Sequence, residues 1–197
     1  MYAENIEYFP SGVSFEALGV SYTLNIPGEF SVYNALCAIG VCKACGISEQ
    51  DIAQGLKSST GVKGRAEVVQ TNKEYTVIID YAHTPDGIEN ILKTVRGFAK
   101  GRVIILFGCG GDRDNTKRPL MGKIAGQFAD FCIVTSDNPR SEDPDAIIDM
   151  IVPGVKESGA EYVVIPDRYN AIEYALNMGR AGDVIVLAGK GHETYQV

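Results

Sequence analysis

The chain has 197 residues, of which 45% are hydrophobic and 22% charged, and its formal net charge is −7. This composition is typical of a globular protein that can build one large core or one and a half smaller ones. The acidic balance argues against nucleic acid or an anionic membrane as a partner. No apolar run reaches the roughly 20 residues that span a bilayer, and the first residues lack the pattern of a secretory signal.

The cysteines are odd in number and show no framework spacing, which indicates a reducing, cytoplasmic location. There are five of them: Cys37, Cys42, Cys45, Cys109 and Cys132. Cys42 and Cys45 form a single CxxC pair, whereas a structural zinc site of this type needs a second pair. We interpret all five as reduced packing residues and predict no metal site.

The first part of the chain is predicted to contain strands followed by helices. Residues 14–18 and 20–26 alternate between apolar and polar side chains, as strands do, and two or three strands bury too little to stand alone. Two helices with serine N-caps follow, namely Ser31–Cys45 and Ile47–Leu56, capped by Ser31 and Ser48. Gly46 is the expected end of the first helix.

A short stretch of small and polar residues at 58–64 has the composition of a linker. We place a domain boundary there, between residues 1–62 and residues 63–197. The first segment is predicted to be the end of a domain whose larger part is absent from this sequence.

Strands and helices alternate strictly after this boundary. The predicted strands are 75–79, 102–107, 131–135, 161–165 and 183–188, and the predicted helices are 85–99, 120–128, 145–151 and 169–178. Such alternation predicts an α/β fold with a doubly wound, mostly parallel, Rossmann-like sheet.

Polar loops follow four of these strands, at residues 80–85, 108–119, 136–140 and 189–193, and they include both histidines of the chain. Ligands of open parallel sheets bind at the carboxyl ends of the strands. We therefore expect one binding site at this edge, although loops at strand ends are polar in many proteins without a site.

The predicted edge carries charges of both signs. Its cations are Arg113, Lys117, Arg118, Arg140 and Lys190, and its acids are Asp80, Asp112, Asp114, Asp137 and Glu193. Guanidinium groups bind carboxylates and carboxylates bind ammonium groups. A mixed edge therefore favours a zwitterion, and an amino acid is the simplest such ligand.

Several common motifs are missing from the sequence. It contains no G-x4-G-K-[ST] phosphate loop, and no serine or cysteine lies in a nucleophile elbow. The glycines at 108–111 resemble a dinucleotide fingerprint, but Arg113 stands where a further glycine is required.

Six stretches in chain order resemble the Mur ligases, the ATP-dependent amino-acid ligases of peptidoglycan synthesis. They are 30–36, 64–67, 80–86, 108–122, 137–144 and 189–193. The similarity is strongest to the members that add meso-diaminopimelate. These enzymes have a UDP-sugar domain, a central ATPase domain and a C-terminal Rossmann-like domain. The resemblance implies that 1–62 ends the central domain and that 63–197 is the amino-acid-binding domain without its last elements.

The resemblance also implies site residues. For the nucleotide cleft they are Asn34, Arg65, Asp80 and His83, and for meso-diaminopimelate they are Arg113, Asp137, Asn138, Arg140, Gly189 and Glu193. ATP and Mg²⁺ are implied as cofactors, with most Mg²⁺ ligands upstream of this sequence. UDP-MurNAc-dipeptide would bind through the missing domains. No residue of this chain is assigned a catalytic role.

The implied reaction forms an amide bond through an acyl phosphate, which the amine of diaminopimelate attacks. The chain would then position the amino acid and complete the nucleotide site, with a hinge near residues 61–64. The alternative is a non-catalytic amino-acid-binding module. A receiver-like or phosphatase-like domain that uses Asp80 ranks lower, because no second acid adjoins Asp80 to bind magnesium.

Overall fold

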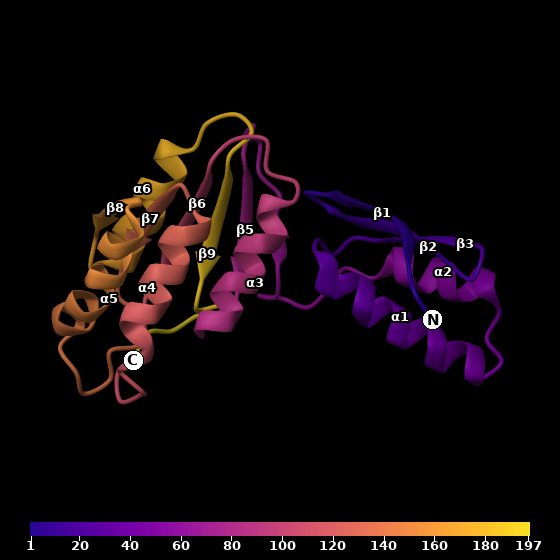
Figure 1. Ribbon diagram of the computed structural model, residues 1–197, viewed down its shortest axis with the longest axis horizontal. Helices are drawn as coiled ribbons and strands as arrows, with labels where there is room; N and C mark the ends of the chain where they lie inside the picture. Colours follow the sequence, from indigo (N-terminus) through magenta and orange to yellow (C-terminus); the bar gives the residue numbers. More distant parts are fainter. The chain divides into compact units, whose positions relative to one another are not determined.

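The computed structural model describes residues 1–197 without a gap. The chain divides into two compact units, Met1–Val62 and Lys63–Val197, and both are drawn in Figure 1. Each unit is described by itself below.

The first unit packs two helices on a small antiparallel sheet. Its strands are β1 (Glu4–Phe9), β2 (Gly12–Ala17) and β3 (Val20–Leu24), in the order β1-β2-β3, and its helices are α1 (Glu29–Ala44) and α2 (Glu49–Ser58). Alternate residues of β2, namely Val13, Phe15 and Ala17, enter the core beside apolar residues of α1. This period of two is what a sheet with one buried face requires.

The prediction that Ser31 caps the first helix is wrong. Helix α1 begins at Glu29, and its N-cap is Gly28, whose φ is 102°. Ser31 is buried in the first turn, where its hydroxyl donates a hydrogen bond of 3.0 Å to the carbonyl oxygen of Pro27. The Pro27–Gly28 turn therefore starts the helix earlier, because Gly28 adopts a backbone conformation that other residues rarely reach.

The predicted end of the first helix at Gly46 and the predicted cap of the second helix at Ser48 are confirmed. Gly46 has a φ of 80°, and the N–H groups of Gly46 and Ile47 donate to the carbonyl oxygens of Lys43 and Cys42, each at 3.0 Å. This is the Schellman arrangement that ends many helices. The hydroxyl of Ser48 accepts a hydrogen bond of 3.2 Å from the N–H of Asp51 and caps α2.

The second unit contains a six-stranded sheet, in the order β4-β5-β9-β6-β7-β8. The strands are β4 (Glu67–Val69), β5 (Thr76–Asp80), β6 (Val103–Phe107), β7 (Phe131–Val134), β8 (Glu161–Val164) and β9 (Val184–Ala188). All pairs are parallel except β4 with β5. The predicted α/β fold with a mostly parallel sheet is confirmed, whereas the short edge strand β4 was not predicted.

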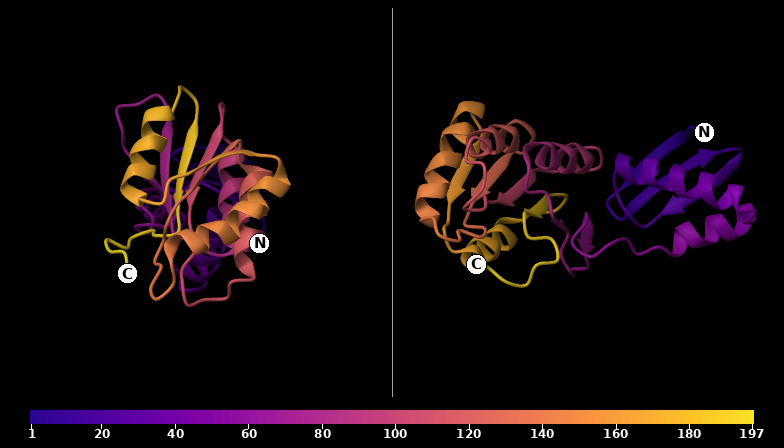
Figure 2. Two further views of the ribbon diagram at one scale, coloured as in Figure 1. Left: turned by 90° about the vertical axis from the view of Figure 1, so that its left-hand side faces the viewer. Right: turned by 90° about the horizontal axis from the view of Figure 1, so that it is seen from below.

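Helices cover both faces of this sheet. They are α3 (Pro85–Arg96), α4 (Lys117–Phe128), α5 (Pro144–Ser158) and α6 (Arg168–Met178). Helices α3, α4 and α5 share one apolar core with the sheet, and α6 packs against the opposite face in another. Figure 2 shows α6 on the side of the sheet away from α4 and α5. The central strand β6 is buried over its whole length, as parallel strands covered on both faces are.

Three predicted helix ends differ from the structure. Helix α3 ends at Arg96 rather than at residue 99. Helix α4 begins at Lys117 rather than at Leu120, because the first turn of a helix tolerates Pro119. Helix α5 continues through Pro153 to Ser158 instead of ending at residue 151. The buried Val155 continues its apolar face past the proline, and this packing outweighs the lost hydrogen bond.

The register of the parallel strands brings their carboxyl ends to one edge. Asp80 pairs with Ala188, and Phe107 pairs with Val134. The loops that follow β5, β6, β7 and β9 therefore leave the sheet side by side. None of the helices of the chain combines the length and the apolar composition needed to cross a membrane.

Candidate functional site

A cavity of about 360 Å³ lies at this edge of the second unit. The loops after β5, β6, β7 and β9 and the start of α4 form its wall. The lining residues are Tyr81, His83, Thr84, Cys109, Gly110, Arg113, Asp114, Lys117, Arg118, Met121, Asp137, Asn138, Arg140, Gly189 and Glu193. All of them belong to the second unit.

The structure brings all six residues predicted for the amino acid to this cavity, namely Arg113, Asp137, Asn138, Arg140, Gly189 and Glu193. Of the four residues predicted for the nucleotide, only His83 lines it. Arg65 and Asp80 lie near it in the same unit. Asn34 is an exposed residue of α1 in the first unit.

Asp137 presents a buried carboxylate to the cavity. The residue is 8% exposed, and its Oδ1 accepts a hydrogen bond of 2.7 Å from the N–H of Asn138. Oδ2 is buried and has no hydrogen-bond partner in the protein. Gly189 faces this oxygen, and a Cβ atom there would come within 2.6 Å of it. The glycine therefore leaves room for Oδ2, which lies buried without a partner in the protein.

Glu193 is the second carboxylate of the cavity. Its oxygens accept hydrogen bonds from the hydroxyl of Tyr81 and from the side-chain amide of Asn138, each at 3.2 Å. Burial raises the pKa of Glu193, but these two hydrogen bonds and the charge of Lys190 outweigh burial. The pKa therefore lies below its usual range, and the group is ionised at neutral pH.

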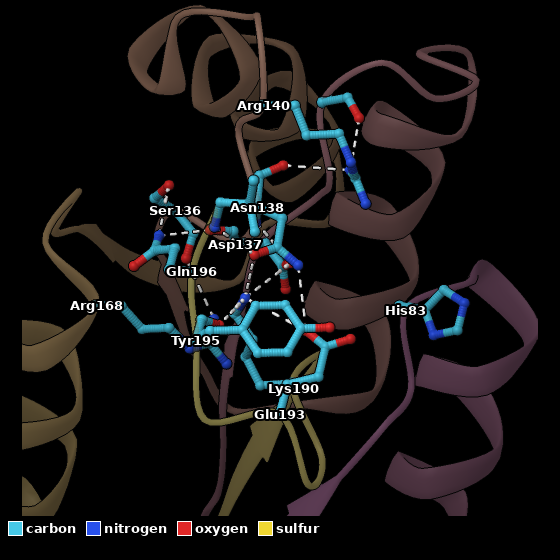
Figure 3. Close-up of polar contacts among 12 residues, drawn as sticks. His83, Ser136, Asp137, Asn138, Arg140, Arg168, Lys190, Glu193, Tyr195 and Gln196 are labelled. Carbon is cyan, nitrogen blue, oxygen red and sulfur yellow. Dashed lines mark hydrogen bonds and ion pairs between the residues drawn. The ribbon is translucent and has the colours of Figure 1, made fainter.

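Arg140 and Arg113 supply exposed guanidinium groups to the same cavity. Nη1 of Arg140 donates to the carbonyl oxygens of Gly111 and Asn138, at 2.7 and 3.4 Å. Its Nη2 and Nε make no hydrogen bond to the protein, so they can bind a carboxylate. Figure 3 shows Arg140 to one side of the Asn138 and Glu193 cluster. The cavity thus offers anions and cations at separate places.

Arg118 behaves differently from the other predicted cations. It is 1% exposed, and its two terminal nitrogens donate to both oxygens of Glu142, at 2.8 and 2.7 Å. The hydrogen bond from Arg118 is the main reason that the pKa of Glu142 falls to about 2. Arg118 therefore forms its ion pair with Glu142 and not with one of the acids that we grouped with it from the sequence.

Sequence reasoning missed two residues that support the site. Arg168, at the start of α6, donates to the carbonyl oxygens of Ala188 and Ser136, at 2.7 and 3.3 Å. It holds the strand ends just before Asp137 and Gly189. Its position just after the cap residue Asp167 offered no signal, because an arginine there is usually solvent-exposed.

Tyr81 is the second missed residue, and it links the cavity to Arg65. The guanidinium carbon of Arg65 lies 5.3 Å from the centre of the Tyr81 ring. The rings of His83 and His192 lie 4.8 and 5.7 Å from the same ring. Its place between Asp80 and His83 in a predicted loop could have singled it out.

Asp80 does not line the cavity. Its two oxygens accept hydrogen bonds of 2.7 Å from the N–H groups of Ala66 and Ala82. Burial raises its pKa in spite of these bonds. Asp80 therefore ties the segment that carries Arg65 to the end of β5. The chain contains no group of three or more His, Cys, Asp or Glu side chains that could hold a metal ion.

Residues 64–191 match the family model described as Mur ligase, glutamate ligase domain. The chain belongs to the Mur ligase family. It is 53% identical over 199 aligned residues to the UDP-N-acetylmuramoyl-L-alanyl-D-glutamate–2,6-diaminopimelate ligase of Caldanaerobacter subterraneus subsp. tengcongensis. It is 48% identical to the enzyme of the same name from Clostridioides difficile. Both alignments cover 99% of this chain and 41% of the relative. The chain thus spans about two fifths of these Mur ligases.

Solved structures support the same family. A structure of UDP-N-acetylmuramoyl-L-alanyl-D-glutamate–2,6-diaminopimelate ligase is 36% identical, with a TM-score of 0.74, over 99% of this chain and 41% of that one. A UDP-N-acetylmuramate-alanine ligase from Thermotoga maritima is 25% identical, also with a TM-score of 0.74, over 98% of this chain and 43% of that one. The fold described above is therefore that of Mur ligases.

Proposed function

We propose that this chain is the amino-acid-binding part of an ATP-dependent Mur ligase that adds meso-diaminopimelate to UDP-MurNAc-L-Ala-D-Glu. One observation carries the proposal. The carboxylates of Asp137 and Glu193 and the guanidinium groups of Arg113 and Arg140 line a single cavity. The printed names of the relatives, which are 2,6-diaminopimelate ligases, support this choice of ligand.

The charges of the cavity match one amino-acid head of the ligand. Asp137 Oδ2, which has no partner in the protein, accepts a hydrogen bond from the ligand ammonium group, together with Glu193. The free Nη2 and Nε of Arg140 bind the carboxylate of the same head as a fork. The amine of the other head then stays free to attack an acyl phosphate of the D-glutamate side chain. Positioning of this kind can lower a barrier by up to ~7–11 kcal/mol.

The same arrangement disfavours L-lysine. Lysine carries an ammonium group where diaminopimelate has a complete amino-acid head, so Arg140 would lose its carboxylate partner. The guanidinium would then face a cation. A hydrogen bond to a charged group contributes about 1.5–3 kcal/mol, which corresponds to a preference of roughly 10- to 100-fold for diaminopimelate.

The nucleotide would bind beside this cavity. We propose that Arg65 and His83, which flank the Tyr81 ring, contact the phosphates of ATP, and that Asp80 positions Arg65 through Ala66. We also propose Asn34 of the first unit as a nucleotide contact. The chain has no group of three or more His, Cys, Asp or Glu side chains that could hold a metal ion, and we assign Mg²⁺ no ligand and no step here.

A second candidate function is amino-acid binding without catalysis. It is favoured by the observation that the second unit alone lines the cavity. In that case the chain would bind the same amino acid but would take no part in an ATP-consuming ligase reaction.

Isothermal titration calorimetry of the 197-residue chain tests the proposed ligand. We expect meso-diaminopimelate to bind and L-lysine to bind at least about tenfold more weakly. The variant Asp137→Asn, which is nearly isosteric, should lose the heat of binding. Equal affinity for the two amino acids, or no binding of meso-diaminopimelate, would contradict the assignment. Reconstitution of amide synthesis with the remaining domains separates the ligase from the binding module.

A further inference from the structure

Lys190 is a buried cation beside the cavity. It follows β9, it is 9% exposed, and it does not line the cavity. Its Nζ donates to the side-chain oxygen of Asn138 and to the carbonyl oxygen of Tyr195, the latter at 2.9 Å. The same nitrogen lies 3.5 Å from Glu193 Oε2 and 3.9 Å from Asp137 Oδ1. Figure 3 shows these side chains gathered around Lys190.

Three of the four partners of Lys190 are residues of the cavity wall, namely Asp137, Asn138 and Glu193. An ammonium group has three donors, and Asn138, Tyr195 and Glu193 account for them. Lys190 therefore has no donor left for a ligand. Its contacts act on the side chains that face the cavity.

Lys190 also sets the direction of the Asn138 amide. The Oδ1 atom of Asn138 accepts from Lys190 and from the N–H of Val197, the latter at 3.0 Å. The Nδ2 atom consequently points the other way and donates to Glu193. A residue without a donor at position 190 would remove the stronger of the two contacts that hold this orientation.

Lys190 differs from the other charged groups around the two carboxylates, because it contacts both of them. Asp137 and Glu193 face the buried cation Lys190, the half-buried cation Arg168 and the hydroxyl of Tyr81. The hydrogen bonds of Arg168 go to the carbonyl oxygens of Ser136 and Ala188, so its charge acts only through space. Lys190 is the cation in direct contact with both acids. Without it, Glu193 would lose a charge that favours its ionised form.

We propose that Lys190 is a positioning residue that holds Asp137, Asn138 and Glu193 in place from behind the cavity and keeps Glu193 ionised. The cavity can then receive an ammonium group over the whole neutral pH range. The part of the inference that concerns an ammonium ligand rests on the proposed function. The part that concerns the ionisation of Glu193 does not.

Titration of the side-chain carboxyl carbons by ¹³C NMR, in the ligand-free 197-residue chain, tests the ionisation directly. Glu193→Gln assigns the Glu193 signal. In Lys190→Met we expect the midpoint of Glu193 to rise by about 1–3 pH units. Lys190→Arg keeps the charge and should keep this midpoint near that of the parent chain. The control Lys123→Met, which breaks only the exposed pair of Lys123 with Glu157, should not move it.

Calorimetry with meso-diaminopimelate between pH 5.5 and 8 gives the second measurement. The affinity of the parent chain should stay level across this range. The affinity of Lys190→Met should be weaker at pH 5.5 than at pH 8, because the carboxyl with the raised pKa is partly protonated at the acid end of this range. A residue with a purely structural role would weaken binding equally at every pH.

The outcomes separate the two proposals. If the parent chain binds no meso-diaminopimelate while the Glu193 midpoint moves in Lys190→Met, the ligand assignment fails and the role of Lys190 stands. If that midpoint stays unchanged in a folded Lys190→Met, the role of Lys190 is refuted. Should that variant fail to fold, Lys190→Gln replaces it, since glutamine keeps a donor but no charge. Failure of both to fold would show that Lys190 holds the fold, which also overturns the proposal.

Discussion

At the level of single residues, two side chains of the cavity have arrangements that cost stability. Asp137 keeps one carboxylate oxygen without a partner, and a buried unsatisfied group costs about 1–3 kcal/mol. A ligand ammonium group would remove this cost, so the arrangement favours binding over stability. Arg140 is a second residue with an unfavourable local arrangement. Its φ of 52° lies in the left-handed region that most side chains avoid.

Arg140→Ala should weaken the binding of meso-diaminopimelate by about 10- to 100-fold, because two charge-assisted hydrogen bonds to a carboxylate are lost. Arg140→Lys keeps the charge but not the planar fork, so it should recover only part of the affinity. Calorimetry on both variants checks this expectation. Near-normal affinity in Arg140→Ala would remove Arg140 from the ligand site.

The pair of Arg118 and Glu142 predicts how stability depends on pH. The pKa of Glu142 is lowered to about 2, so its contribution is present above the unfolded-state pKa near 4.5 and is lost as the pH falls toward 2. Glu142→Gln should lower the melting temperature by several degrees at pH 7, since it leaves the buried Arg118 without a charged partner. The difference from the parent chain should shrink below pH 4.5. A constant difference down to pH 2 in thermal melts would argue against this pairing.

Among the elements, the packing of α4 on α5 positions one side of the cavity. The helices touch through glycines, and a Cβ atom on Gly154 would lie 2.8 Å from the backbone nitrogen of Lys123. Real Cβ atoms do not come so close. Helix α4 begins with Lys117 and Arg118 at the cavity, so a shift of this helix would move the cavity wall.

Gly154→Ala should therefore destabilise the second unit by about 1–3 kcal/mol, the usual effect of overpacking, and it should also weaken amino-acid binding. Gly55→Ala is the matched control, because Gly55 is a helical glycine of α2 and a Cβ atom added there would have no other atom within 4 Å. Alanine there should be neutral or stabilising by up to about 1 kcal/mol. Chemical denaturation of both variants measures these changes in stability. Equal stability of the two variants would refute the close approach of α4 and α5 at Gly154.

In the molecule as a whole, the cavity belongs to one unit. Every lining residue lies within Lys63–Val197, and this unit has its own cores on both faces of the sheet. Its affinity for an amino acid should not depend on the first unit.

A chain of residues 63–197 should consequently bind meso-diaminopimelate with an affinity within about threefold of the full 197 residues, a difference below about 1 kcal/mol. Parallel titrations of the two chains measure this. A large loss on removing residues 1–62 would show that the cavity is incomplete in the second unit.

The 197-residue chain should not hydrolyse ATP, with or without meso-diaminopimelate. Its sequence contains no G-x4-G-K-[ST] loop, which cradles the phosphates in nucleotide triphosphatases. Release of inorganic phosphate above the background of a blank preparation would contradict this expectation.

Local patterns in the sequence were sufficient to predict the kind and order of most elements and the edge at which the site lies. Short apolar runs, the Ser48 cap and the end of α1 at Gly46 depend on neighbours within a few residues. The resemblance to Mur ligases identified the six residues that the structure gathers in one cavity. Its assignment of a nucleotide site stays a prediction.

Which charges meet became clear only from the arrangement of the strands in space. Arg118 reaches Glu142, and Lys190 reaches Asn138, across separations of 24 and 52 residues. The sequence shows that these groups are present but not which of them are in contact, because the contacts depend on how the strands are ordered in the sheet. The continuation of α5 through Pro153 was likewise settled by packing. Burial against a neighbouring helix contributes more than the single hydrogen bond that a proline removes.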